Sequence, residues 1–145
     1  MTEQAIVPLY FEIPFPPTAN HLFVNGKGGK GRFTSPAYKA WKMEAGIVAK
    51  AQAKGKRISG TYAMEVRLVR PDGRKRDASN YLKAVEDLFV WLGVVDDDSE
   101  CQFVSAEWVK KGPACFVAIR PCLRWGGSPW ITQQQSEPSM TEPAP

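Results

Sequence analysis

The 145-residue sequence has little of the chemistry that would crosslink a small protein or anchor it in a membrane. It contains three cysteines and one histidine, with no CxxC pair. Isolated cysteines in odd number argue against a disulfide framework and a zinc site, and they predict a protein of the reducing cytoplasm. No apolar run approaches the ~20 residues of a membrane-spanning helix, and the first residues lack a signal-peptide pattern. We therefore expect neither secretion nor membrane insertion.

Acidic residues are also fewer than basic ones, and the imbalance is uneven along the chain. The net charge is +4 and the pI about 9.0. Residues 126–145 contain no Lys or Arg and two Glu, so the remainder has 19 basic and 13 acidic residues, a net charge of +6. This excess is compatible with a nucleic-acid partner but does not establish one.

Length and hydrophobic periodicity predict one α+β domain with a mixed β-sheet and two helices packed on one face. The expected order is β-loop-α-β-α-β-β over residues 1–124, followed by a disordered tail at 125–145. The predicted strands cover 5–13, 61–69, 101–109 and 114–120, with a hairpin-like turn at 110–113. A long loop is expected at 18–34. The helices are expected to run from Ser35-Pro36 to about Lys54, and from Asp77 to about Trp91.

The buried faces follow from side-chain spacing. The first helix is predicted to bury Tyr38, Trp41, Ala45, Val48 and Ala49. The second is predicted to bury Tyr81, Leu82, Val85, Leu88 and Phe89. Alternation in the strand at 61–69 places Tyr62, Met64, Val66 and Leu68 on one face. Core packing is the preferred interpretation of Trp41, Trp91 and Trp108, although aromatic side chains can also stack on nucleic-acid bases.

The segment 70–100 concentrates charges of both signs. A basic cluster leads directly into Asp77, a helical pattern follows, and three consecutive aspartates, Asp96, Asp97 and Asp98, close the segment. Mg²⁺ binds one or two carboxylates together with water and substrate phosphate. Cations beside carboxylates therefore indicate a site for a polyanion and a divalent metal. The alternative is structural, because an aspartate before a helix is commonly an N-cap and DDD after a helix is commonly a solvated turn.

Three polar residues mark the beginning of the second helix. Asp77, Asn80 and Lys83 are spaced three apart, so they share one edge of a helix, away from its apolar stripe. Helix N-termini favour anions because unpaired N–H groups and the macrodipole both point there. The spacing predicts that a phosphate lies at this end, with Lys83 able to offset charge.

These residues also carry a resemblance to a known family. The segments PFPPTANHLF, SPAYKAW, RDASNYLKAVEDLF and LGVVDDDSECQFV, spanning about residues 8–120, resemble the RusA family of Holliday junction resolvases of phages and prophages. The resemblance implies a homodimeric, Mg²⁺-dependent endonuclease, with Mn²⁺ as a possible substitute, acting in the cytoplasm of a bacterial host. Such enzymes cut four-way junctions symmetrically, using three aspartates and one lysine per subunit.

Residue by residue, the resemblance places catalytic roles on Asp77, Lys83 and Asp98, with Asp77, Asp98 and Asp97 as the metal ligands. One position departs from the family pattern, because Ser79 stands where the best-known members have an aspartate. Asp96 or Asp97 could substitute for it, or Ser79 and Asn80 could bind through neutral oxygens.

DNA-backbone contacts are expected from the clustered cations Lys27, Lys30, Arg32, Arg70, Arg74, Lys75 and Arg76. Three hypotheses follow: a metal-dependent junction resolvase, a branched-DNA-binding protein that lost cleavage with Ser79, or an unrelated protein whose aspartates only cap and turn. The sequence does not separate a resolvase from a flap or fork nuclease. His21, the single histidine, is expected to be loop surface.

Overall fold

Four strands form the central sheet of the computed structural model, which describes residues 3–4, 8–29 and 31–122. Their order is β2–β8–β6–β7, with β2 at Leu9–Ile13, β8 at Cys115–Pro121, β6 at Tyr62–Val69 and β7 at Cys101–Val109. β8 is antiparallel to both neighbours, whereas β6 and β7 run parallel. The parallel pair requires a crossover, and α2 (Leu82–Trp91) provides it.

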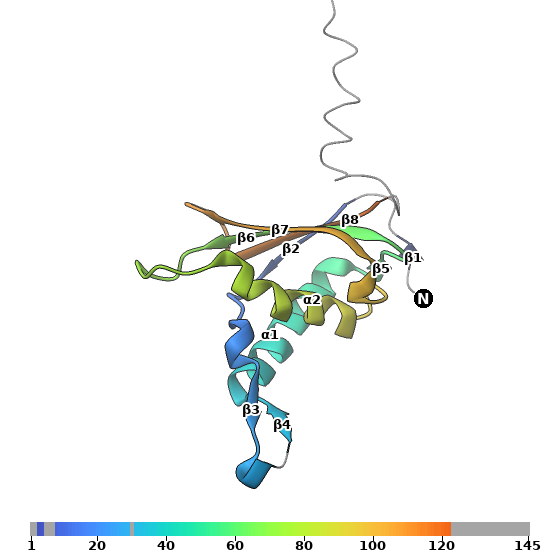
Figure 1. Ribbon diagram of the computed structural model, residues 1–145. Helices are drawn as coiled ribbons and strands as arrows, with labels where there is room; N and C mark the ends of the chain where they lie inside the picture. The colour runs from blue at the N-terminus through green and yellow to red at the C-terminus, as the bar shows by residue number, and fades with distance from the viewer. Residues whose placement is uncertain (1–2, 5–7, 30, 123–145) are drawn as a thin grey trace, which may run out of the picture.

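Both helices cover one face of this sheet, as predicted (Figure 1). α1 (Pro36–Ala53) begins as expected, because the Ser35 hydroxyl accepts a hydrogen bond from the Tyr38 amide and Pro36 occupies the first helical position. Gly93, with φ of 76°, follows the C-terminal end of α2. The α+β class and the two-helix layer are therefore confirmed, and the predicted tail at 125–145 lies outside the described residues.

The core lies between the helices and the sheet. The predicted inward face of β6 is completely buried, and in α2 the side chains of Val85, Leu88 and Phe89 are fully buried with it. The Phe89 ring lies 4.7 Å from the Phe11 ring of β2, measured between centroids. Among the described residues, no helix is both long enough and apolar enough to cross a membrane.

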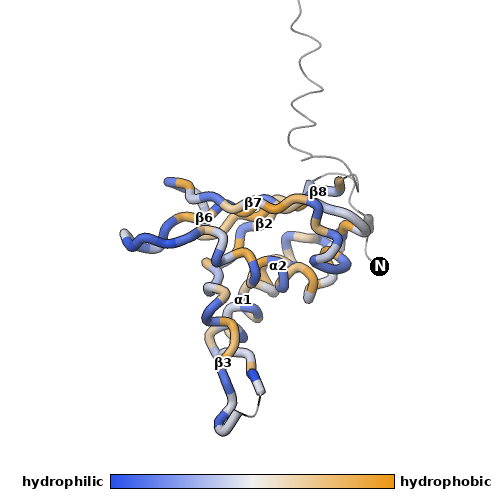
Figure 2. The backbone as a smooth tube through the Cα atoms, in the orientation of Figure 1, coloured by the Kyte–Doolittle hydropathy of each residue, from blue (hydrophilic) through white to orange (hydrophobic). Residues whose placement is uncertain are grey.

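The predicted loop at 18–34 is not a loop throughout. It contains β3 (Phe23–Asn25) and β4 (Arg32–Thr34), an antiparallel pair that we call the β3–β4 arm (residues 23–34), although residue 30 is not described. The arm extends away from the sheet, and Figure 2 shows apolar and polar segments along it. The many glycines of this segment predicted a loop. Each of the two strands has only three residues, which is too short for an alternating pattern to be recognised.

The connection between β7 and β8 was also predicted incorrectly. A hairpin would make these consecutive strands neighbours, but β6 lies between them and pairs with both. The residues at 110–113 therefore cross the end of β6. In addition, a short parallel pair joins β1 (Glu3–Gln4) to β5 (Lys56–Arg57).

Two predicted core side chains are exposed. Val48 on α1 is 38% exposed and Trp91, the last residue of α2, is 51% exposed. Helical spacing alone placed both on an apolar stripe, but Trp91 lies beyond the edge of the core and packs on α1 at Gly46. An ideal β-carbon added to Gly46 would be 2.9 Å from Trp91 Cζ3.

The packing of α2 predicts a clear difference between two aliphatic truncations. Leu88→Ala removes a fully buried side chain and should lower the free energy of unfolding by ~2–5 kcal/mol. Ile47→Ala, at a position 70% exposed on α1, should change it by less than ~0.5 kcal/mol. Urea denaturation followed by circular dichroism measures both, and equal losses would contradict the assigned core.

Candidate active site

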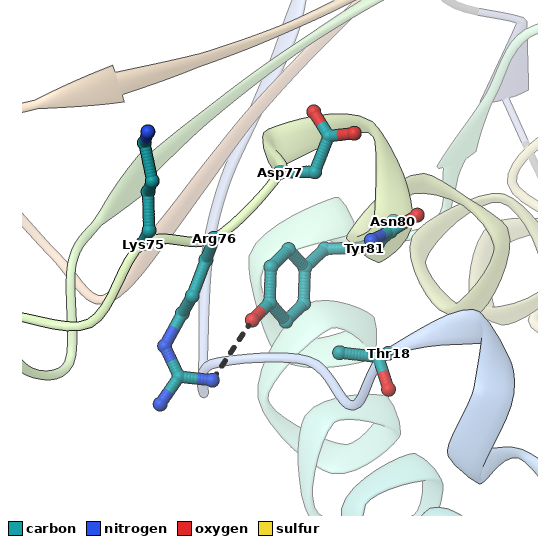
Figure 3. A pocket seen from close by; sticks show the side chains of 6 residues that line it. All are labelled: Thr18, Lys75, Arg76, Asp77, Asn80 and Tyr81. Atoms are coloured by element: carbon teal, nitrogen blue, oxygen red, sulfur yellow. Dashed lines mark hydrogen bonds between the residues drawn. The ribbon is translucent and has the colours of Figure 1, made fainter.

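An open pocket lies where the segment after β6 meets the beginning of the second helical region. It is lined by Thr18, Lys75, Arg76, Asp77, Asn80 and Tyr81 (Figure 3). Tyr81 is buried, and its ring contacts Phe15 and Trp108 at centroid distances of 4.9 and 5.8 Å. These ring contacts fix the position of Tyr81, which belongs to the pocket lining.

The helix behind this lining does not begin at Asp77 as predicted. Ala78–Tyr81 is a 3₁₀ turn, and the α-helix begins only at Leu82. The tighter turn has three residues per turn, so Asp77 and Asn80 remain neighbours in the same pocket. The Asp77 side chain makes no capping hydrogen bond. Asp77 thus occupies the N-cap position, as the structural alternative predicts, but its carboxylate does not cap the turn.

Asp72 organises the basic segment that borders the pocket. Its carboxylate accepts a hydrogen bond of 2.6 Å from Arg76 Nη2 and one of 3.0 Å from the Arg74 amide. The hydrogen bond from Arg76 is the main reason that the pKa of Asp72 lies below its usual range. Arg70 lies over the ring of Trp108, and the distance from the Arg70 guanidinium carbon to the ring centroid is 4.6 Å. These contacts are made within the segment itself, without a ligand.

Lys83 joins two acidic residues at the edge of α2. Its Nζ atom lies 3.1 Å from Asp87 Oδ1 and 3.6 Å from Asp98 Oδ2. The hydrogen bond to Asp87 is the largest of the effects that raise the pKa of Lys83, so this residue is a cation at neutral pH. The structure therefore brings together two of the predicted catalytic residues, Lys83 and Asp98.

The three consecutive aspartates have three different environments. Asp96 forms an ion pair with Arg57 and accepts a hydrogen bond of 3.0 Å from the Gly60 amide, so it fastens the chain after α2 to the segment before β6. Asp97 caps the 3₁₀ turn at Asp98–Glu100, and the hydrogen bond from the Ser99 side chain lowers its pKa. Only Asp98 is directed to Lys83.

The predicted metal ligands are not assembled into one cluster. In the described part of the chain, no group of three or more His, Cys, Asp or Glu side chains is arranged to hold a metal ion. Asp77 lines the open pocket, and Asp97 is engaged by its own turn. The donor chemistry suits Mg²⁺, for which one or two carboxylates with phosphate and water are enough.

The predicted DNA-binding cations occupy two regions. Lys75 and Arg76 line the pocket, and Arg70 and Arg74 precede them in the same segment, where the Arg74 side chain is 81% exposed. Lys27 and Arg32 lie on the β3–β4 arm, and Lys30 lies outside the described residues. His21 is exposed, but it has a structural contact: Thr18 Oγ1 and His21 Nδ1 are 2.6 Å apart at the base of the arm.

Sequence reasoning missed two acidic residues of the site, Asp87 and Glu86. Asp87 pairs with Lys83 and also accepts a hydrogen bond of 3.5 Å from the Tyr38 hydroxyl. The i, i+4 spacing from Lys83 could have identified it. Glu86 is half-buried, and desolvation by burial is the main reason that its pKa is raised, against the opposing effect of Lys83. Its position one residue before Asp87 gave no signal of burial.

Comparisons with known proteins identify the family of the chain. The profile of the family described as "Endodeoxyribonuclease RusA" matches residues 14–120. The crossover junction endodeoxyribonuclease RusA of Aquifex aeolicus is 30% identical over 124 residues, which cover 83% of this chain and 96% of that protein. The chain thus belongs to a DNA-cleaving class of enzyme. The chain is a member of the RusA family of endodeoxyribonucleases.

The separate environments of the aspartates predict separate effects on stability. Asp96→Ala removes the contacts with Arg57 and the Gly60 amide, and it should lower the free energy of unfolding by roughly 1 kcal/mol, since the pair is partly exposed. Asp98→Ala should change the free energy of unfolding by less than ~0.5 kcal/mol, because Lys83 retains its ion pair with Asp87. Chemical denaturation compares the two variants, and a larger loss for Asp98→Ala would reverse the assignment.

Proposed function

We propose that this protein is a divalent-metal-dependent endonuclease that resolves four-way DNA junctions by symmetric phosphodiester hydrolysis. The observations that carry the proposal are the Lys83–Asp98 ion pair and a pocket in which Asp77 lies together with the cations Lys75 and Arg76. Membership of the RusA family supports an endodeoxyribonuclease. The name of the Aquifex relative, a crossover junction enzyme, supports the junction as substrate.

Asp77 and Asp98 are the proposed metal ligands, with Asp97 beside them. Mg²⁺ is the expected ion, and Mn²⁺ the expected substitute. A bound divalent ion would acidify water and polarise the scissile phosphate. Asp98 can turn from Lys83 toward a cation without leaving the lysine unpaired, because Lys83 is closer to Asp87 than to Asp98. Asp87 therefore keeps Lys83 in an ion pair when Asp98 binds the metal.

The remaining residues position and stabilise the DNA. Lys83 stays charged at neutral pH and can stabilise negative charge that develops on the phosphate or the leaving oxygen. Lys75 and Arg76 line the pocket, so they can bind the neighbouring phosphates and give the affinity a steep dependence on salt. Asn80 offers a neutral oxygen and N–H groups to the same pocket.

Two copies of the chain would place two such sites on a twofold axis, which matches the two strands that must be cut in a four-way junction. We therefore propose a homodimer, encoded by a phage or prophage and acting in the bacterial cytoplasm.

A second candidate function is branched-DNA binding without cleavage. It rests on Ser79, which stands in the 3₁₀ turn at the position where the best-known family members have an aspartate.

A synthetic four-way junction tests the proposed reaction. With Mg²⁺, the wild-type protein should introduce paired nicks across the branch point, and with EDTA it should bind without cutting. A linear duplex of the same sequence should remain intact.

Asp98→Asn keeps the shape of the side chain but removes its charge. It should therefore reduce cleavage by at least ~100-fold, the scale of losing a catalytic charge, while junction binding is retained. Cleavage by Asp98→Asn at the wild-type rate would show the assignment of Asp98 to be wrong.

Restoring the family carboxylate separates the two candidate functions. Ser79→Asp adds an anionic oxygen beside Asn80, so it should strengthen metal binding measured by calorimetry. A large gain in junction cleavage over an inactive wild type would favour the binding protein. An unchanged rate in an already active enzyme would favour the nuclease. Ser105→Asp, on a strand of the sheet, is the control for an added negative charge.

A further inference from the structure

A second surface feature lies beyond the pocket, where the β3–β4 arm meets the two helices. A groove there is lined by Phe33 and Thr34 of β4, Lys39, Lys42 and Met43 of α1, and Trp91 of α2. Its lining combines two aromatic rings with two lysines and contains no acidic residue. The function assigned to the pocket does not use these residues.

The apolar side chains of this groove are unusually exposed. Phe33 is 57% exposed, and Val24, its directly opposite partner in the arm, is 46% exposed. Because paired residues project from the same face of a two-stranded ribbon, they form one apolar surface. Phe23 projects from the opposite face and contacts Tyr38 of α1 at 6.2 Å between centroids. The arm is thus held at its base while Phe33 remains available.

The charge of the surrounding surface selects an anionic ligand. Residues 13–43 include no Asp or Glu but contain five Lys or Arg residues. Lys42 Nζ lies 4.9 Å from the centroid of the Trp91 ring and 5.5 Å from that of Tyr38. Aromatic rings interleaved with cations are the arrangement that binds unpaired nucleic-acid strands, where bases stack and phosphates contact the cations.

A continuous series of contacts connects the groove with the candidate active site along α2. Lys83 pairs with Asp87, and Asp87 accepts a hydrogen bond from Tyr38. The Lys42 ammonium then lies over Tyr38 and over Trp91. Residues 83 and 91 are ~12 Å apart along a helix axis. A strand whose phosphate lies at Lys83 can therefore reach the groove within a few nucleotides.

We propose that this groove binds a nucleobase unstacked at the branch point of the DNA. The base stacks on Phe33 with Trp91 as the opposite wall, while Lys39 and Lys42 contact the adjoining phosphates. This proposal rests on the proposed function, because the branch point of an opened four-way junction is where paired bases lose a stacking neighbour. The groove distinguishes branched from linear DNA, in which every base is already stacked on its neighbours.

Photocrosslinking tests the groove directly and without cleavage. A four-way junction carrying 5-iododeoxyuridine at the branch point is bound in EDTA and irradiated, and the crosslinked peptide is identified by mass spectrometry. The expected product contains Phe33 or Trp91. Phe33→Ser should abolish the crosslink at Phe33 and weaken junction binding by ~10-fold, the scale of losing one stacked base. Tyr10→Ser is the matched control, because Tyr10 is 55% exposed on the uncovered face of the sheet, and its affinity should equal that of the wild type.

A second variant examines the cations separately. Lys42→Met retains the apolar stem, so it should reduce the salt dependence of junction binding by about one ion and preserve the crosslink. If the crosslinks formed elsewhere and Phe33→Ser bound junctions with wild-type affinity, base binding in the groove would be refuted. The proposed junction cleavage would not be affected by that result. A change from dimer to monomer in Phe33→Ser, measured by sedimentation, would also overturn base binding, since the groove would then contact a second copy. A wild-type protein that neither binds nor cuts junctions would refute both proposals.

Discussion

The packing of α2 against the sheet is the constraint on which the rest of the structure depends. One side of this helix buries Val85, Leu88 and Phe89 completely, and that burial fixes its rotation about its own axis. The opposite edge must then carry Lys83 and Asp87 to the surface, toward Asp98. A helix of ten residues has too little intrinsic stability to hold this orientation alone. The hydrophobic stripe therefore sets the geometry of the charged residues.

Much of this arrangement was predictable because strong local patterns agree with the fold. The alternation of β6, the Ser35 cap and the stripe of α2 all appear in the structure. The errors arose where tertiary contacts decide the outcome. Strand order is not encoded in adjacent residues, so β6 between β7 and β8 was missed. The exposure of Trp91 depends on where α1 passes, which helical spacing within α2 does not specify.

The site illustrates the same limit at the level of single residues. Asp96, Asp97 and Asp98 are chemically identical and consecutive, yet one fastens Arg57, one caps a turn and one meets Lys83. A sequence indicates that acidic residues are present, but the backbone directions of successive residues decide which carboxylate meets which partner. The family resemblance assigned a catalytic role to Asp98, and that role stays a prediction. The structural roles of Asp96 and Asp72 required the coordinates.

The position of β8 in the interior of the sheet has a consequence for how the protein is made. This strand is the last described element, and it pairs with β2 near the beginning of the domain and with β6 in the middle. Pairings between distant segments form slowly because the intervening chain must be closed first. During synthesis, β2 and β6 have no shared neighbour until residue 121 has left the ribosome. The sheet beneath the site is therefore assembled late, only after all of its strands through β8 have been synthesised.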